Sequence, residues 1–283
     1  MDQNKLFRAF EKSKAERLHE QPKSQIDVAR NMIAERPLAS PASRVLAELV
    51  AKDTLMERKG SLKEMRNPVP MTLNEMKKNR LVYSGMNNRA VLNAYRELRI
   101  ELLDKSESSN ISVMISSVDA LDNSIATALN LAISFSLDFQ SSALLVDCNP
   151  YGTELQSLVT SPLTLGITDY ILSDGLALED MITPSGIERV SVISSGNHPS
   201  SAVELFSSQA MHDLFYELKN RYKDRCIVIN APPVLASSEA RVLTRYCHQS
   251  VLTVPYGRAN MDAIGDAVDA LGAANVSGLV YQQ

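Results

Sequence analysis

The sequence lacks the features that mark membrane-spanning, secreted and metal-binding chains. No apolar run approaches the roughly 18–20 residues that a membrane-spanning helix needs. The three cysteines lie far apart with no paired spacing, which gives no disulfide or metal motif and fits a reducing compartment. The first 20 residues are too highly charged for a secretory signal. Together these absences predict a cytoplasmic protein.

A uniform excess of basic residues is also missing. Residues 1–90 contain 18 lysine and arginine residues against 11 acidic ones, whereas the remainder contains 11 against 22. A basic arm on an acidic body suits an anionic membrane surface or an acidic partner, but the mixing of bases with acids favours a solvated helical extension. The acidic body, without a basic patch that carries aromatic residues, argues against nucleic-acid binding.

Apolar patterning divides the chain near residue 88. Residues 1–87 carry five prolines and little sustained apolar periodicity, which predicts a helical and partly disordered extension. An amphipathic helix follows, with Val91, Ala94, Leu98 and 100–103 on its expected apolar face. From there short apolar runs alternate with helical patterns. The predicted strands are 111–116, 142–147, 190–194, 225–230, 249–254 and 276–280, and the predicted helices are 124–137, 166–173, 202–222, 237–246 and 260–273.

This alternation predicts an α/β domain over 88–283, with a mostly parallel, doubly wound sheet between two helical layers. Ligands of such sheets bind beyond the carboxyl ends of the strands. At the first of these ends, the stretch "SSVDALDNSIATALNLA" has the strand–turn–helix frame of a phosphate loop. Its turn contains neither glycine nor lysine.

Beyond this frame, several stretches resemble the cytoplasmic bacterial tyrosine kinases (BY-kinases) of capsule and exopolysaccharide synthesis, relatives of the MinD/ParA-type phosphate-loop proteins. They occur in the family's order over roughly residues 90–281. The matching stretches are "AYRELRIELL", "SS…ATALNLA", "ALLVDCNPYGTELQSL", "GITDYILSDGLALEDMI", "VSVISSGNHPSSAVELFSS", "MHDLFYELKNRYKDRCIVINAPPVLASSEA" and "GLVYQQ". The resemblance implies a phosphate-loop NTPase-like fold. An unrelated α/β protein with a chance polar turn is the weaker reading.

The phosphate-loop positions depart from the family's pattern, which reads like P-G-E-G-K-S-T. Aligned without a gap, the slots from the first glycine to the magnesium-binding hydroxyl hold Leu121, Asp122, Asn123, Ser124 and Ile125. Glycines let backbone amides converge on phosphate, and a side chain such as that of Leu121 disfavours those conformations. Ser124 replaces the phosphate-binding lysine, and Ile125 has no atom that could bind magnesium. The acids in the turn give it the wrong sign of charge for ATP.

The acidic motifs of the family are also incomplete. Asp147 fills the first slot of the D-x-D pair, but Asn149 fills the second and Tyr151 the slot of the following arginine. Asn230 replaces the acid after the next core strand and lacks the formal charge that a hard divalent cation favours. The C-terminal tyrosine cluster of the family is reduced to Tyr281, which we expect in the last strand.

The helix before the first core strand carries the remnant of an oligomerisation motif. The family's E-x-x-R-x-x-R is here Asn93, Arg96 and Arg99, so the acid is missing. With Tyr95, the two arginines are the predicted interface, because a planar guanidinium binds carboxylates bidentately. Two merely exposed arginines are an equal alternative. Pairing with a subunit that offers the acid remains open, in a homo- or hetero-oligomer.

These departures predict a pseudokinase without catalytic residues, cofactor or metal. The resemblance implies a regulator or scaffold in exopolysaccharide or capsule biosynthesis. It would dock on the cytoplasmic segment of a polysaccharide co-polymerase or on an active BY-kinase, and lie at the inner membrane only through that partner. The alternative is an ATP-dependent protein tyrosine kinase that binds ATP and Mg by noncanonical contacts.

Overall fold

The computed structural model describes Met65 and residues 67–106, 111–120, 124–173, 175–198, 202–221, 225–257 and 260–282. All of these residues belong to one compact unit that spans 56–283. The predicted extension up to residue 64, and the turn residues Leu121, Asp122 and Asn123, lie outside the described residues.

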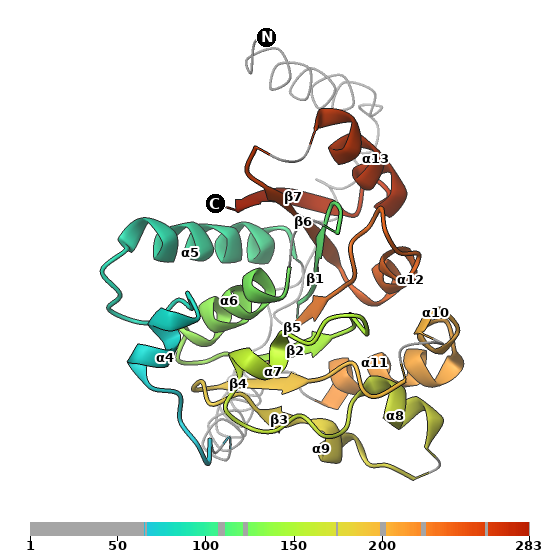
Figure 1. The fold of residues 1–283 in the computed structure, drawn as a ribbon, viewed down its shortest axis with the longest axis horizontal. Helices are drawn as coiled ribbons and strands as arrows, with labels where there is room; N and C mark the ends of the chain where they lie inside the picture. The colour runs from blue at the N-terminus through green and yellow to red at the C-terminus, as the bar shows by residue number, and fades with distance from the viewer. Residues whose placement is uncertain are drawn as a thin grey trace, which may run out of the picture. The chain divides into compact units, whose positions relative to one another are not determined.

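A seven-stranded sheet forms the centre of the unit, in the order β3-β4-β2-β5-β1-β6-β7 (Figure 1). Every neighbouring pair is parallel except the antiparallel pair of β3 with β4. Such a sheet with crossover helices is the doubly wound architecture that the sequence predicts. The strands are β1 (Ser112–Ser117), β2 (Ser142–Asp147), β3 (Thr183–Pro184), β4 (Val190–Ile193), β5 (Arg225–Asn230), β6 (Gln249–Pro255) and β7 (Val276–Gln282).

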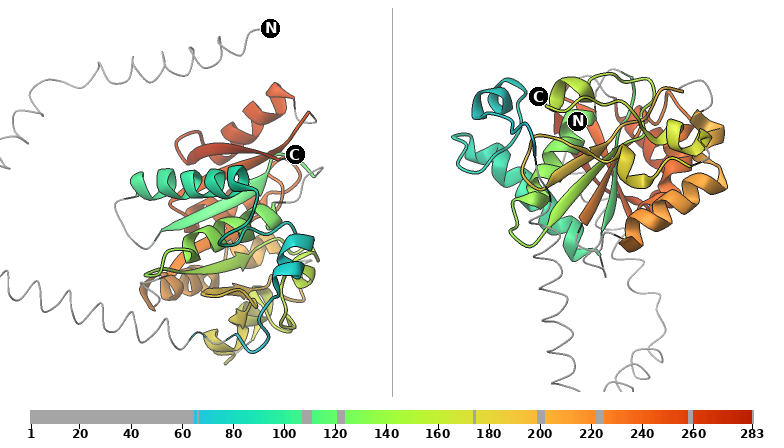
Figure 2. Two further views of the ribbon diagram at one scale, coloured as in Figure 1. Left: turned by 90° about the vertical axis from the view of Figure 1, so that its left-hand side faces the viewer. Right: turned by 90° about the horizontal axis from the view of Figure 1, so that it is seen from below.

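Helices cover both faces of the sheet and make it the middle of three layers (Figure 2). Successive strand residues point to opposite faces, so Met114 packs in one apolar cluster while Val113 and Ile115 pack in the other. Strands buried on both faces read as continuous apolar runs, which made them recognisable in the sequence. One layer contains α4 (Leu73–Lys78), α5 (Arg89–Asp104), α6 (Ile125–Ser136) and α7 (Leu155–Leu158); the other contains α8 (Ile167–Leu172), α9 (Leu178–Met181), α10 (Ala202–Phe206), α11 (Gln209–Arg221), α12 (Glu239–Leu243), the 3-10 turn Thr244–Tyr246 and α13 (Met261–Leu271).

Local differences from the predicted elements have identifiable causes. The single helix expected over 202–222 is two helices, because Ser208 interrupts it: its hydroxyl donates to the Leu205 carbonyl and accepts from the Met211 amide. The predicted apolar face of α5 is wrong at Val91, Ala94 and Ile100, which are exposed. Leu102, within the predicted face, is buried as expected, and Leu92, which the prediction left out, is buried as well. Tyr281 lies in the last strand, as predicted.

Residues 67–87, which the sequence assigned to the extension, contribute side chains to the core. Met76, Leu81 and Val82 are buried in the cluster beneath α5 and α6. Asn130 of α6 joins this segment through its side chain, which accepts from the Val82 amide (2.8 Å) and donates to the Arg80 carbonyl (3.2 Å). The segment is therefore packed against the sheet's helical layer as well as connected to it along the chain.

Candidate functional site

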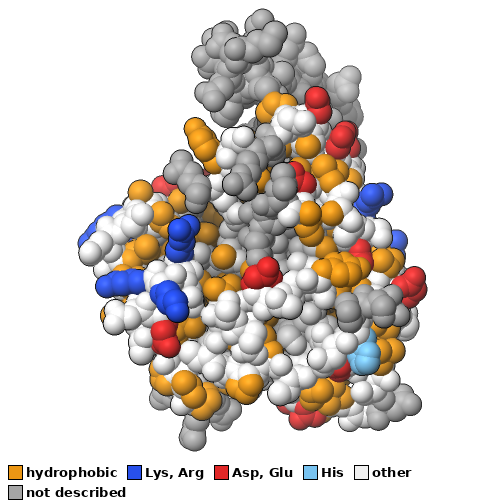
Figure 3. Space-filling view, viewed as in Figure 1, with side chains coloured by type: hydrophobic (Ala, Val, Ile, Leu, Met, Phe, Trp, Pro, Cys, Tyr) orange, Lys and Arg blue, Asp and Glu red, His pale blue; other side chains and the backbone are white. Residues whose placement is uncertain are grey.

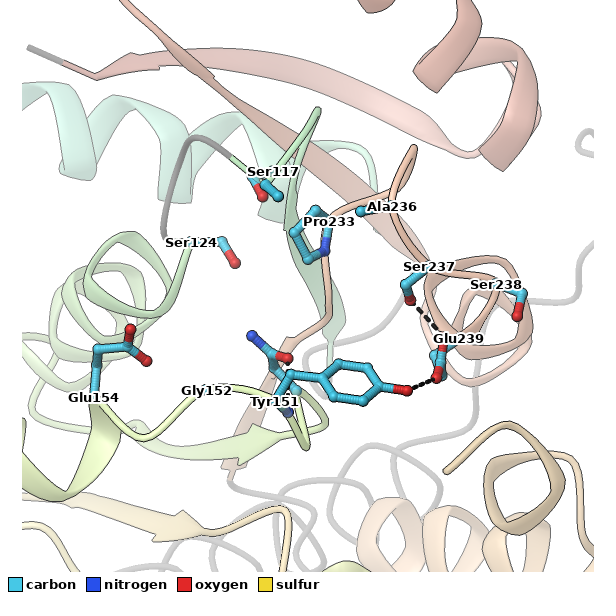
Figure 4. Close-up of a pocket in the computed structure, with 12 residues that line it drawn as sticks. Ser117, Ser124, Tyr151, Gly152, Glu154, Pro233, Ala236, Ser237, Ser238 and Glu239 are labelled. Carbon is cyan, nitrogen blue, oxygen red and sulfur yellow. Dashed lines mark hydrogen bonds between the residues drawn. The ribbon is translucent and has the colours of Figure 1, made fainter. Parts of the chain in front are cut away.

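A pocket lies beyond the carboxyl ends of β2, β5 and β1, three strands that neighbour each other in the sheet (Figure 4). This is where an open parallel sheet binds its ligands. The cavity measures about 680 Å³, within the range of small-molecule sites. Its lining residues are Ser117, Ala120, Ser124, Asn149, Tyr151, Gly152, Glu154, Pro233, Ala236, Ser237, Ser238 and Glu239.

A chain of hydrogen bonds joins the loops beneath the pocket. The Ser124 hydroxyl donates to Asn230 Oδ1 (2.7 Å), and Asn230 Nδ2 donates to Asp147 Oδ1 (2.8 Å). The same Asp147 oxygen accepts from the Asn149 amide (3.0 Å). Parallel pairing places Asp147 and Asn230 at the same register position of adjacent strands, which brings them together. Four residues that the sequence singled out, Ser124, Asp147, Asn149 and Asn230, thus form one network.

Burial sets the protonation chemistry of this network. The Asp147 side chain is shielded from water, which raises its pKa to about 6 despite the opposing hydrogen bonds from Asn230 and the Asn149 amide. Burial likewise raises the pKa of the adjacent Cys148 thiol well above its ordinary value. The thiol is therefore protonated at neutral pH and is not a nucleophile.

Tyr151 and Glu239 close one side of the pocket. The Tyr151 hydroxyl donates to Glu239 Oε1, and the Ser237 hydroxyl donates to the other carboxylate oxygen. The bond to Glu239 raises the pKa of Tyr151 to about 12. Burial by itself raises the pKa of Glu239, but the hydrogen bonds from Ser237 and Tyr151 outweigh it and leave that pKa lowered. Glu239 is thus an ionised carboxylate that neutral hydroxyl groups hold in place.

The described residues do not fit a magnesium–triphosphate complex. None of the described residues that line the pocket is a lysine, arginine or histidine, whereas Glu154 and Glu239 are carboxylates. The Ile125 side chain, at the slot of the magnesium-binding hydroxyl, packs in the apolar core. Among the residues with described positions, no three acid, histidine or cysteine side chains gather as a metal site. Triphosphate carries several negative charges, so this charge balance opposes its binding.

The predicted interface on α5 lies in a different part of the molecule. Lysine and arginine side chains gather where α4 and α5 form the surface (Figure 3). Tyr95 packs on the core, and its burial raises its pKa. The Arg99 guanidinium donates to the Ser134 carbonyl (2.7 Å), so it already stabilises the contact of α5 with α6. Arg96 is half-buried. The use of these residues between subunits stays a prediction.

Sequence reasoning missed the pairing of Tyr151 with Glu239 and the position of Glu154. Tyr151 was noted only because it fills an arginine slot. Glu239 follows the carboxyl end of β5 after a polar run, "ASSE", and that position was the available signal. No pattern in the sequence relates residues 151 and 239, because the fold alone brings the two loops together.

No model of a known protein family matches the chain. Two curated relatives nevertheless align over more than half of the chain. The chain is 28% identical over 178 residues to the tyrosine-protein kinase YwqD of Bacillus subtilis, covering 62% of this chain and 73% of that protein. It is 26% identical over 160 residues to the tyrosine-protein kinase CpsD of Streptococcus pneumoniae, covering 56% and 69%.

Solved structures agree in fold. The kinase domain of the Escherichia coli tyrosine kinase ETK superposes with a TM-score of 0.63 at 23% identity, over 76% of this chain and 88% of that one. The chimerical protein CapA2B2 also gives a TM-score of 0.63, at 20% identity over 79% and 97%. At such identities the superpositions establish the fold alone. The aligned sequences identify the chain as a relative of the bacterial tyrosine kinases.

Proposed function

We propose that this chain is a non-catalytic relative of the BY-kinases that acts as a regulator or scaffold in exopolysaccharide or capsule biosynthesis. One observation carries the proposal: of the described residues that line the pocket beyond β1, β2 and β5, two are carboxylates and none is a lysine, arginine or histidine. Phosphoryl transfer depends on positioning and on charge stabilisation by lysine and metal. With Ser124 at the lysine position, and Ile125 and Asn230 at positions that contact the metal in the family, the site offers neither the lysine nor the metal ligands.

Isothermal titration of the full chain with Mg-ATP tests this proposal. We expect no binding heat up to roughly millimolar nucleotide, because the pocket opposes triphosphate by charge and offers magnesium no ligand set. The matched control is the tyrosine-protein kinase YwqD titrated under the same conditions, since it aligns over 178 residues with this chain. Micromolar affinity for this chain would favour the alternative, an ATP-dependent tyrosine kinase with noncanonical contacts built around the retained Asp147.

Partial repair of the phosphate loop is expected to fail. A chain with Leu121→Gly, Asn123→Gly and Ser124→Lys regains the glycines and the lysine, but Asn149 and Asn230 still occupy acid positions. We therefore expect no autophosphorylation in a radiolabelled-ATP assay, provided that thermal unfolding shows the variant to be folded. Incorporation of label into the repaired chain would mean that the acid positions are dispensable and would contradict the proposal.

A scaffold acts through its partner. The resemblance supports docking on the cytoplasmic segment of a polysaccharide co-polymerase or on an active BY-kinase, with localisation at the inner membrane through that contact. The described residues contain no helix that is both long and apolar enough to cross a bilayer. Arg96 on α5 is the proposed contact with a subunit that offers the missing acid.

A further inference from the structure

Negative charge lies both in the pocket lining, at Glu239, and beneath the pocket, at Asp147, and the described residues do not balance it with a cation. Asp147 and Glu239 are 4% and 3% exposed, respectively. The hydrogen bonds described for their carboxylates come from neutral amides and hydroxyls, and the described ion pairs all lie elsewhere. Buried carboxylates in folded proteins are ordinarily paired with a positive charge. The site is therefore suited to a positively charged ligand.

The shape of the pocket also suits a flat cation. Glu154 and Glu239 lie on opposite sides, with the Tyr151 ring between them (Figure 4). Hydrogen bonds hold Tyr151 at its backbone and at the tip of its side chain. The Tyr151 amide donates to Asn149 Oδ1 (3.2 Å), and its hydroxyl donates to Glu239. Tyr151 is nevertheless 61% exposed, which leaves ring surface accessible. A guanidinium group over such a ring gains a cation–π interaction while its edges donate to carboxylates.

Gly152 keeps the space beside Glu154 open. A Cβ added at this position would lie 3.0 Å from Glu154 Oε2 and 3.1 Å from Asn149 Nδ2, tighter than nine in ten real Cβ contacts. The missing side chain thus leaves the Glu154 carboxylate and the Asn149 amide facing the cavity. Ser117, Ser124 and Ser237 add hydroxyl acceptors around it. The part of the lining that the structure describes offers many acceptors and no lysine, arginine or histidine side chain.

We propose that this pocket binds an arginine side chain presented by a peptide segment of a partner protein. The inference rests on the proposed function, because a pocket that still bound Mg-ATP would not be free for a partner. Arginine suits the site better than a bare metal ion. Its five N–H donors spread over a plane match dispersed acceptors, whereas a hard divalent cation needs several oxygens converging on one point.

A titration followed by NMR on the full chain tests the proposal with three capped tripeptides. They are acetyl-Gly-Arg-Gly-amide, its lysine analogue, and its citrulline analogue, in which a neutral urea of nearly the same shape replaces the guanidinium. We expect the arginine peptide to bind at least about tenfold more tightly than the citrulline peptide, because charged hydrogen bonds are the stronger ones. Lysine should fall between them, since it cannot stack or bind as a fork.

Substitutions of pocket residues test whether the arginine peptide binds in this pocket. Glu154→Gln should weaken the arginine peptide several-fold, and Tyr151→Leu should weaken it further by removing the ring. Glu97→Gln, an equal charge change on exposed α5, should leave the affinity unchanged. If the arginine peptide fails to bind, binds no better than citrulline, or responds equally to Glu97→Gln and Glu154→Gln, the proposal is overturned. If the arginine peptide fails and the chain also does not bind Mg-ATP, the proposed function stays intact. Micromolar binding of Mg-ATP would overturn the proposed function itself.

Discussion

The variant Asp147→Asn is expected to be more stable than the parent chain at pH 8, by up to about 3 kcal/mol in the free energy of unfolding. Folding buries this carboxyl and raises its pKa to about 6, roughly two units above its ordinary value. Each unit corresponds to about 1.4 kcal/mol. Asparagine keeps an oxygen that can accept from Asn230 and from the Asn149 amide, but it carries no buried charge. Removal of an unbalanced charge therefore stabilises the folded state.

The pH dependence of this effect has a definite sign. Because the folded-state pKa of Asp147 is raised, the native chain holds this proton to higher pH than the unfolded chain does. The contribution of Asp147 to stability is thus full below about pH 4 and is lost as pH rises through about 6. The difference between parent and variant should be near zero at pH 3.5 and largest above pH 7.

Urea unfolding of both proteins across this pH range measures the difference. Asp104→Asn, a change at an exposed carboxyl near the end of α5, serves as the control and should shift stability by less than about 0.5 kcal/mol. A variant that is less stable than the parent at pH 8 would show that the Asp147 charge is balanced in the folded protein. The inference of unbalanced negative charge beneath the pocket would then be wrong.

Leu81→Ala is expected to destabilise the whole α/β unit by about 2–5 kcal/mol. Leu81 is 1% exposed and packs in the cluster beneath α5 and α6, so truncation leaves a cavity in the core. The measurement is the urea unfolding free energy, followed by a probe of the sheet rather than of the local segment. We propose from this packing that 67–87 fold together with the domain that the sequence placed at 88–283.

Leu73→Ala provides a matched control on the same segment. Leu73 begins α4 and is 58% exposed, so the same chemical change should cost less than about 0.5 kcal/mol. Equal effects of the two substitutions would indicate that the segment contributes no specific packing. An unchanged unfolding free energy for Leu81→Ala would mean that residues 67–87 do not fold with the α/β domain and belong to the N-terminal extension.

The positions of the central strands could be predicted from the sequence because a strand that is buried on both faces has a continuous run of apolar residues. The four apolar residues 143–146 between Ser142 and Asp147 form such a run, and the predicted bounds 142–147 are those of β2. The face of α5 was harder to predict. Its apolar residues occur on more than one side of the helix, and only packing against α6 decides that Leu92 is buried while Val91 is exposed. The break at Ser208 depends on a local hydrogen-bonding choice that competes with helix continuation.

By itself the sequence determined the doubly wound architecture and the residue types between β1 and α6, where no glycine or lysine occurs. These properties follow from residue types at short spacings, which the order of the chain specifies directly. Only the tertiary structure decided that Asp147 is shielded from water, that Tyr151 meets Glu239 across 88 positions, and that Leu81 belongs to the core. Burial and charge balance depend on which distant segments the sheet brings together, and no local pattern encodes those neighbours.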